Sequence, residues 1–273
     1  MLKRIAVPFL FGLLTVGAST AAQAQRRSPL ADAPAIRKRV ELRETRLELG
    51  AAIGSTINQT FYHGVMANVH LGFHINDWLS IGAVGAFDVT QVATGFHGDL
   101  INTLPLTAVP KPSSDSRAPT QAVASSGINK PGAIFAAEAE VTPFTGKYSL
   151  FGKLFAHYDF YAFGGPALVN LSTAKGGGGA PKCADAVAGS TVDVCVVTGS
   201  KIGATFGGGF HSFFNNFLAL NVELRDVLIK DNPAGRDVNG DQTVNNADLT
   251  LTQHWLAVIG LTVYFPANAS VSP

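Results

Sequence analysis

The feature that most constrains this chain is an alternation of apolar and polar residues with period two, repeated in segment after segment. In "FLALNVELRDV" (217–227), Leu218, Leu220 and Val222 fall on one face of an extended chain, and the residues between them fall on the other. The stretches "IFAAEAEV" (134–141) and "TRLELGAAI" (45–53) alternate in the same way. Successive side chains of a β-strand point to opposite faces, so the pattern predicts an all-β protein.

The alternating segments number eight, and their connections differ in length on the two sides. The segments span about 45–56, 61–74, 78–89, 132–143, 153–171, 199–212, 217–230 and 252–265. Short turns follow at 74–78, 143–153 and 213–217, whereas long Pro-, Gly- and Ser-rich stretches cover 90–131, 172–198 and 231–251. The first hairpin, around 55–59, is the one short connection on the long-loop side. An even number of strands with short turns on one side and long loops on the other predicts an eight-stranded antiparallel transmembrane β-barrel, with periplasmic turns and extracellular loops.

Composition favours a membrane barrel over the alternative, a secreted soluble barrel or sandwich whose strands would also alternate. Only 14% of the residues are charged, yet no apolar run after residue 24 reaches the 18 residues of a spanning helix. Aromatic residues such as Phe61, Trp78, Phe217 and Trp255 concentrate near segment ends, where interfacial girdles need them. We therefore expect the bacterial outer membrane as the location and its lipid as the surroundings.

The N-terminus reads as an export signal. Lys3 and Arg4 precede an apolar run (5–16) and small residues ending in "AQA" (22–24). We expect a signal peptide at 1–24, a periplasmic segment at 25–43, the barrel at 44–265 and a C-terminal tail at 266–273. The periplasmic segment is either a flexible lead or a partner-binding arm, and its Ala-, Pro- and Arg-rich composition favours the lead. Export also predicts a disulfide between the two cysteines, Cys183 and Cys195.

The inward faces of the predicted strands carry charges of both signs. The set comprises Arg46, Glu48, His70, Asp88, Glu138, Glu140, Lys153, His157, Asp159, Lys201, Glu223 and Arg225. An eight-stranded barrel is just wide enough for side chains to fill, and buried charges must be paired, so these residues should interlock as an ion-pair network that closes the lumen. The alternative, a small channel or proton path, uses the same residues.

We expect no catalytic site. A lipid-modifying barrel enzyme, the second alternative, would need a rim histidine beside a serine or a carboxylate. His63, His97 and His254 lie near the expected outer edge, with Ser55 and Asp88 as candidate partners, but no nucleophile motif marks any of them. A formal net charge of +1 also gives no reason to expect nucleic acid as a partner.

Several stretches resemble the myxobacterial-type outer-membrane β-barrel domain family. The resemblance runs over about 45–265 and is carried by "PFTGKYSLFGKLFAHYDFYAFGG" (143–165), "FHINDWLSIGAVGAF" (73–87), "GATFGGGFHSFFNNFLALNVELRDVLIKD" (203–231) and "HWLAVIGLTVYF" (254–265). It implies an eight-stranded outer-membrane barrel without established catalytic or ligand residues. It also implies an envelope partner, since some members are linked to gliding-motility machinery. Such barrels finish near an aromatic that the barrel-assembly machinery recognises, here Phe265, although "PANASVSP" (266–273) follows it.

The stretch "DVNGDQTVNNAD" (237–248) is similar to a single calcium loop of the dockerin type. The resemblance assigns side-chain ligands to Asp237, Asn239, Asp241 and Asp248, a backbone carbonyl to Thr243, and a direct or water-mediated contact to Asn245. Gln242 stands where such loops place a turn-forming glycine, and only one copy is present. The alternative is a polar hairpin tip, because Asp, Asn and Gly are favoured in turns. No cofactor is required, and weak calcium binding is the open expectation.

Overall fold

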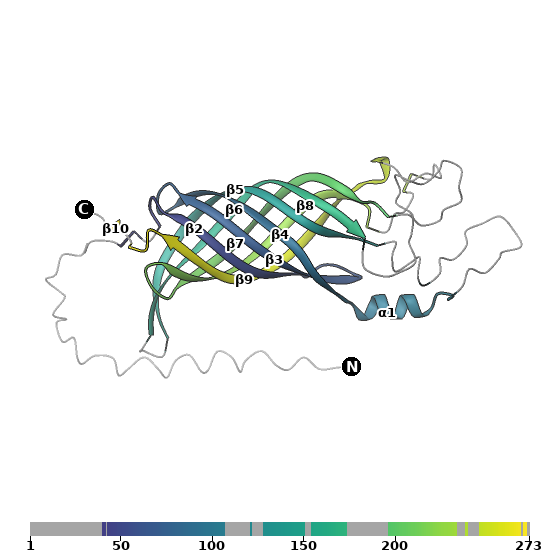
Figure 1. Cartoon of the computed structure of the whole chain (residues 1–273), viewed down its shortest axis with the longest axis horizontal. Coiled ribbons are helices and arrows are strands. Elements are labelled where there is room, and N and C mark those ends of the chain that lie inside the picture. Colours follow the sequence, from purple (N-terminus) through teal and green to yellow (C-terminus); the bar gives the residue numbers. More distant parts are fainter. Residues whose placement is uncertain are drawn as a thin grey trace, which may run out of the picture. The chain divides into compact units, whose positions relative to one another are not determined.

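The protein is a closed antiparallel barrel of eight strands, which confirms the predicted fold class (Figure 1). The computed structural model describes residues 40–41, 43–106, 121, 128–150, 154–173, 196–233, 238–239, 246–268 and 270–271. The barrel strands are β2 (Leu47–Thr56), β3 (Tyr62–His74), β4 (Leu79–Ala93), β5 (Asn129–Leu150), β6 (Leu154–Thr173), β7 (Gly199–Phe213), β8 (Leu218–Asp231) and β9 (Thr250–Phe265).

Each strand pairs with its neighbours in sequence, and β2 pairs with β9 to close the barrel. The closing pair runs in register from Leu47 opposite Phe265 to Thr56 opposite Leu256. Closure leaves the barrel portion of the sheet without an unpaired edge, because every strand finds two partners there. The alternation predicted from the sequence is the alternation between lumen and outer wall: Glu138 and Glu140 are buried while Phe135 and Val141 are exposed.

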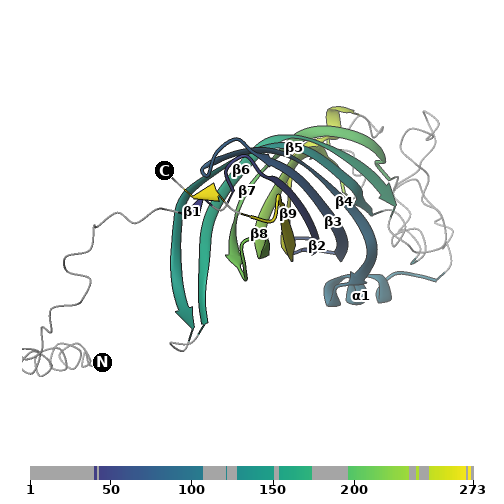
Figure 2. The ribbon, with the colours of Figure 1, turned by 60° about the vertical axis from the view of Figure 1, so that its left-hand side comes forward.

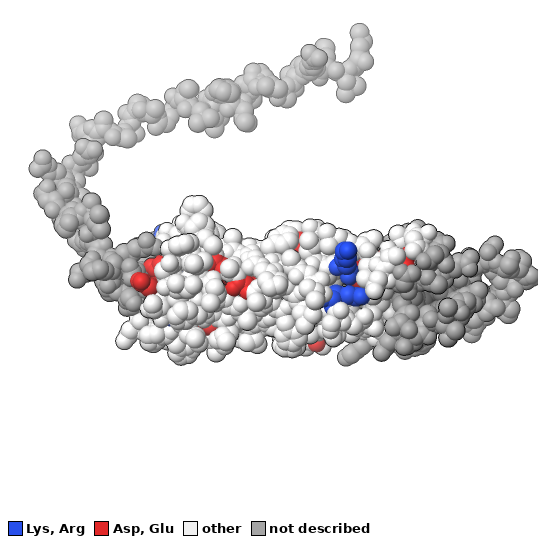
Figure 3. All heavy atoms as spheres, turned by 90° about the horizontal axis from the view of Figure 1, so that it is seen from above, with Lys and Arg blue, Asp and Glu red and all other residues white. Residues whose placement is uncertain are grey.

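The outer wall is apolar, and Figure 3 shows one side of it with few charged side chains. Large apolar residues are exposed on every barrel strand, among them Leu49, Leu71, Ile81, Ile202 and Ile259. Aromatic residues are exposed near the end with the short turns, including Phe73, Trp78, Phe217 and Phe265. No helix of the described residues is long and apolar enough to cross a membrane. An apolar outer wall on a closed barrel of this size is what lipid requires, and the protein lies in the bacterial outer membrane.

The first difference from the expected strands concerns the predicted turn at 143–153, most of which is strand. β5 continues to Leu150 and β6 begins at Leu154, so the two form one long hairpin that extends past the neighbouring strands (Figure 2). Gly146 is accommodated in this strand because the ring of Tyr158 lies against it, 2.6 Å from where a Cβ would stand. An aromatic ring that covers a glycine stabilises a strand position which the glycine alone would weaken.

Two further elements lie outside the expected organisation. The α-helix α1 (Gly95–Asn102) follows β4 inside the stretch predicted as a loop, and the Thr94 side chain caps it by accepting from the His97 amide, 3.2 Å away. β1 (Val40–Glu41) pairs with β10 (Ser270–Val271), so the predicted periplasmic segment and C-terminal tail contain a short strand pair.

Glycines on the inner face of β7 make room for aromatic side chains from β6. A Cβ at Gly207 would meet the ring of Phe163, and one at Gly209 would collide with the ring of Tyr161. These glycines explain the "FGGGF" stretch (206–210), which is otherwise unfavourable in a strand. They place Tyr161 where its hydroxyl donates to Asn221 Oδ1, 2.7 Å away on the far side of β7.

Candidate functional site

The lumen is the candidate functional site, and it is filled by side chains in layers. Starting from the end with the short turns, these are a network of histidines, carboxylates and arginines, then an arginine cluster, then an aliphatic layer, and finally polar pairs at the end with the long loops. The sequence predicted charged residues along the whole inner face. The structure places them mainly in the half nearest the short turns, and the aliphatic layer is the part that this expectation missed.

Three histidines converge on one carboxylate in the layer nearest the short turns. Glu48 Oε2 lies 2.6 Å from His74 Nε2, while Glu48 Oε1 lies 3.2 Å from His70 Nδ1 and 3.8 Å from His211 Nε2. The other ring nitrogen of His211 is 2.9 Å from Asp159 Oδ1. Glu48, His74, His211 and Asp159 are all almost completely buried. The network joins strands β2, β3, β6 and β7, so its charges are compensated across the barrel rather than along one strand.

Arg43 enters this network from the turn before β2. Its guanidinium lies 3.4 Å from Glu140 Oε1 and 3.6 Å from Asp159 Oδ2, and it donates to the Asp77 carbonyl oxygen at 2.6 Å. Burial lowers the pKa of Arg43, but the negative charges around it, with Asp159 foremost, raise that pKa above its ordinary value. The guanidinium therefore stays charged, and it fastens the chain segment before the barrel to the inner wall.

The next layer is organised around Arg225 on β8. Its guanidinium is ion-paired with Glu138 and with Glu223, the latter at 2.8 Å, and it also donates to Thr205 Oγ1 at 3.2 Å. The ring of Phe163 lies 4.4 Å from the guanidinium carbon, a cation–π distance. Arg225 and Glu138 are both almost fully buried. One cation thus balances two carboxylates contributed by β5 and β8.

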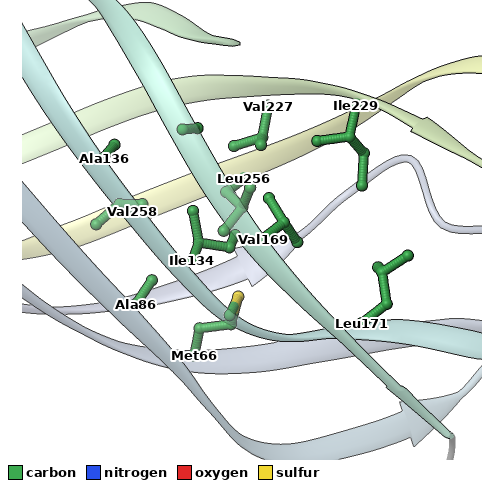
Figure 4. Close-up of a cluster of buried hydrophobic side chains, with 11 residues drawn as sticks. Met66, Ala86, Ile134, Ala136, Val169, Leu171, Val227, Ile229, Leu256 and Val258 are labelled. Atoms are coloured by element: carbon green, nitrogen blue, oxygen red, sulfur yellow. The ribbon is translucent and has the colours of Figure 1, made fainter. Parts of the chain in front are cut away.

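Aliphatic side chains fill the lumen between Arg225 and the end with the long loops. Figure 4 shows this cluster of side chains. This aliphatic plug consists of Met66, Ala86, Ile134, Ala136, Ala167, Val169, Leu171, Val227, Ile229, Leu256 and Val258. Its members come from β3, β4, β5, β6, β8 and β9, so they meet across the lumen. Closely packed aliphatic groups offer neither water nor hydrogen bonds to an ion, so the plug separates the charged half of the lumen from the end with the long loops.

Polar pairs cover the plug on the side of the long loops. Lys130 Nζ lies 2.6 Å from Asp88 Oδ2, and Asn129 Nδ2 donates to Asp231 Oδ1 at 2.6 Å. The remaining oxygen of Asp231 is 3.7 Å from His254 Nε2, whose other ring nitrogen contacts Gln59 Nε2 at 2.7 Å. These contacts hold the ends of β4, β5, β8 and β9 together at the rim.

Of the three rim histidines, His63 and His97 contact neither a serine nor a carboxylate in the part of the chain that the structure describes. His63 Nδ1 contacts the Thr56 carbonyl oxygen at 3.0 Å, and His97 Nε2 contacts the Tyr62 hydroxyl at 2.8 Å. Ser55 donates to a backbone carbonyl and Asp88 holds Lys130, so neither candidate partner faces a histidine. Among the described residues, His254 is the rim histidine that lies beside a carboxylate, and its Nε2 is 3.7 Å from Asp231 Oδ2, longer than a hydrogen bond.

The predicted lumen residues occupy three kinds of place. The lumen is lined by Arg46, Glu48, His70, Glu138, Glu140, Asp159, Glu223 and Arg225. Asp88 and Lys201 lie toward the long loops, and His157 lies on the long β5–β6 hairpin. Lys153 falls outside the described residues. The sequence reasoning did not single out Arg43, His74 or His211. His74 and His211 continue the alternation of His70 and Thr205, which would have found them, whereas Arg43 precedes its strand and carries no periodic signal.

Only part of the calcium-like loop is described. Asp237, Asp241, Thr243 and Asn245 lie outside the described residues, as do Cys183 and Cys195. Asp248 is buried, and its Oδ1 accepts from the amides of Val238 at 2.8 Å and Asn239 at 3.2 Å. The carboxylate at the last loop position thus closes the loop back onto its own second and third residues, an arrangement that serves a polar turn as well as a metal loop.

Comparisons with known proteins return solved structures only. No family model and no curated protein matches the chain. The chain is similar to the N-terminal β-barrel domain of OprF from Pseudomonas aeruginosa, with 9% identity and a TM-score of 0.43 over 81% of this chain and 98% of that one. It is similar to the outer-membrane protein OprG from Pseudomonas aeruginosa, with 8% identity and a TM-score of 0.34 over 82% and 97% of the two chains. It is also similar to the attachment invasion locus protein Ail of Yersinia pestis, with 8% identity and a TM-score of 0.30 over 81% and 99%. Similarity at this level adds no functional argument. The assignment to the outer-membrane barrels therefore stands on the chain's own strand pairing and apolar wall.

Proposed function

We propose that this protein is a non-enzymatic structural or interaction component of the bacterial cell envelope, a barrel whose lumen is closed. The observation that carries the proposal is the aliphatic plug, which lies across the lumen above the paired charges. An ion entering this layer would lose its hydration without gaining ligands, at a cost of several kcal/mol. A small channel, the alternative that the sequence leaves open, is therefore the less favoured function.

Partner contacts on this proposal are made by surfaces at the two ends of the barrel, because its middle is surrounded by lipid. The barrel-assembly machinery would act during biogenesis on the C-terminal strand, β9, which ends at Phe265. An envelope machine, of the gliding-motility type that the sequence resemblance suggests, is the proposed class of lasting partner. The loop at 237–248 is proposed to bind calcium weakly, which would stiffen one end of this surface.

Conductance separates the closed barrel from the channel. The mature protein is inserted into planar lipid bilayers, and correct folding is checked by gel migration with and without boiling. The closed barrel gives no discrete conductance steps in 1 M KCl. A variant with the plug opened, Leu256→Ala combined with Ile134→Ala, is the matched control, because it removes plug volume and leaves the ion pairs in place. Regular conductance steps from the unaltered protein would overturn the proposal.

A further inference from the structure

The long β5–β6 hairpin carries an unpaired strand edge at the end of the barrel with the short turns, where β5 continues past its pairing with β4. β4 pairs with β5 only as far as Val141, and one further bond joins the Thr142 amide to the Trp78 carbonyl oxygen at 2.8 Å. From Phe144 to Leu150, β5 pairs with β6, and no other strand of the described residues pairs with this stretch. At about 3.3 Å per residue, these seven residues extend roughly 23 Å beyond the last β4 contact.

The orientation of the backbone identifies which residues offer hydrogen bonds at this edge. Thr142 is buried on the inner face, and its amide points to the β4 side. In a strand of given direction, residues whose side chains lie on the same face direct their backbone N–H groups to the same side. The inward residues of β5 therefore direct their N–H groups toward the side of β4. The bulge between Val141 and Phe144 shifts the inward set to odd numbers, as the pairing of Lys147 with His157 shows. Lys147 and Ser149 therefore direct their N–H and C=O groups to the free edge.

The two faces of the hairpin differ in chemistry. The outward face carries an aromatic band in which Tyr158 lies 6.0 Å from Tyr148 and 5.9 Å from Phe210 between ring centroids. Phe144 at the start of the band is 67% exposed. The inward face carries the exposed Lys147 next to His157, while Asp159 is engaged by His211 and Arg43. The free edge therefore has an apolar side and a cationic side.

Charge selects among the segments that could occupy this edge. A second copy that pairs antiparallel and is centred on this edge would bring Lys147 against Lys147, and like charges at adjacent strand positions are destabilising. The chain's own segment 25–39 contains Arg26, Arg27, Arg37, Lys38 and Arg39 against the single Asp32, so it has the wrong sign as well. Lysine and proline on an edge strand are known devices against self-pairing, and Lys147 and Pro143 serve that purpose here. Lys147 and Pro143 disfavour self-pairing, but they do not oppose pairing with an extended segment of opposite charge.

We propose that the β5 edge at 146–150 binds an acidic, extended segment of another envelope polypeptide, which adds as a strand with carboxylates facing Lys147 and apolar residues continuing the aromatic band. Strand addition draws affinity from backbone hydrogen bonds and specificity from the alternating side chains. The proposal rests on the proposed function as an interaction component, and it gives that function a contact on the periplasmic side.

A fluorescent peptide of alternating glutamate and valine, nine residues long, tests this binding by anisotropy with the mature protein in lipid nanodiscs. The expected result is saturable binding that weakens between 0.05 and 0.5 M NaCl, as opposite charges require. The same peptide with N-methyl groups on alternate backbone nitrogens should not bind, and a lysine–valine peptide should bind at least about tenfold more weakly.

Two variants test separately how the charge and the backbone edge contribute to peptide binding. Lys147→Glu and Ser149→Pro should each weaken binding at least about tenfold, since the first reverses the charge and the second removes an edge N–H that does not serve the β5–β6 pairing. Lys230→Glu, an exposed charge on β8 near the long loops, is the matched control and should leave binding unchanged. Gel migration with and without boiling verifies that each variant is folded.

Three outcomes would overturn the proposal: no saturable binding at millimolar peptide, equal binding of the N-methylated peptide, or full binding by Ser149→Pro. Self-association of the protein that Ser149→Pro abolishes would assign the edge to a second copy instead, and would overturn the proposal too. None of these outcomes changes the bilayer conductance. Conversely, conductance steps would refute the closed barrel without altering peptide binding, so the two failures can be told apart.

Discussion

Replacing Arg225 by methionine is the sharpest test of how the lumen is stabilised. The substitution keeps an unbranched, flexible side chain, shorter than that of arginine, and leaves the buried Glu138 and the partly buried Glu223 without their shared cation. Removing one member of a buried ion pair costs about 3–5 kcal/mol, because the remaining charge stays desolvated. The lost contact with the Phe163 ring adds about 0.5–2 kcal/mol, and the methionine recovers part of this by packing against the same ring.

The expected loss is therefore about 4 kcal/mol, equivalent to a factor of about a thousand in the ratio of folded to unfolded protein. With a urea dependence of about 2 kcal/mol per molar, the unfolding midpoint should fall by roughly 2 M. The measurement is equilibrium urea unfolding in lipid vesicles, followed by tryptophan fluorescence and by gel migration without boiling.

A triple variant decides whether uncompensated charge is the cause. Arg225→Met combined with Glu138→Gln and Glu223→Gln removes the ionic charges together, so it should recover most of the lost stability. Replacing a whole buried ion-pair cluster by neutral groups destabilises a protein much less than removing one member of the cluster. The reasoning is refuted if the triple variant is as unstable as Arg225→Met, or if Arg225→Met shows no loss of stability. Either result would mean that uncompensated buried charge does not cause the instability.

Three further predictions follow from separate parts of the structure. Gly207→Ala should lower the free energy of unfolding by about 1–3 kcal/mol in the same urea assay, because the added methyl group would meet the Leu224 carbonyl oxygen and the Phe163 ring. Gly95→Ala is the control: the site has open space around it, so the free energy of unfolding should change by no more than about 0.5 kcal/mol. Burial lowers the pKa of His97, so the folded state favours its neutral form; the docking of α1 should be fully stable above about pH 6.5 and weaken as the pH falls through the lowered pKa. Hydrogen exchange of residues 95–102, corrected for its intrinsic pH dependence, should show this weakening, and a His97→Gln variant should not. Calcium titrated calorimetrically into the mature protein should bind in the range of about 0.1–1 mM, and Asp237→Ala should abolish the heat; an absent or unchanged heat would leave the loop as a plain turn.

The strand positions and the in-or-out orientation of most side chains could be predicted from the sequence. Alternation is a local property, since each residue's face is fixed by its neighbours two positions away. For this reason Glu48, Glu138, Glu140, Asp159 and Arg225 could be assigned to the lumen without knowledge of any partner. The same alternation, continued from His70 and from Thr205, places His74 and His211 on the inner face as well.

Other features could not be predicted because they depend on contacts between distant segments. The stretch at 143–150 contains Pro143 and Gly146 and indicates a turn, but Tyr158 on the facing strand covers the glycine and the strand continues. The helix α1 occupies a segment without a clear period, and its His97 is fixed by Tyr62 on β3. Arg43 reaches the lumen from a turn, where alternation gives no information.

The sequence by itself determined an eight-stranded barrel with an apolar wall and a mixed interior, since period-two patterning and loop lengths act through local geometry and the demands of lipid. Only the tertiary structure decided which inward groups meet. Closure of β2 on β9 and the stagger between strands set the height of every side chain in the lumen, and a shift in that stagger would exchange neighbours. The separation into a charged half and an aliphatic plug is a consequence of that register.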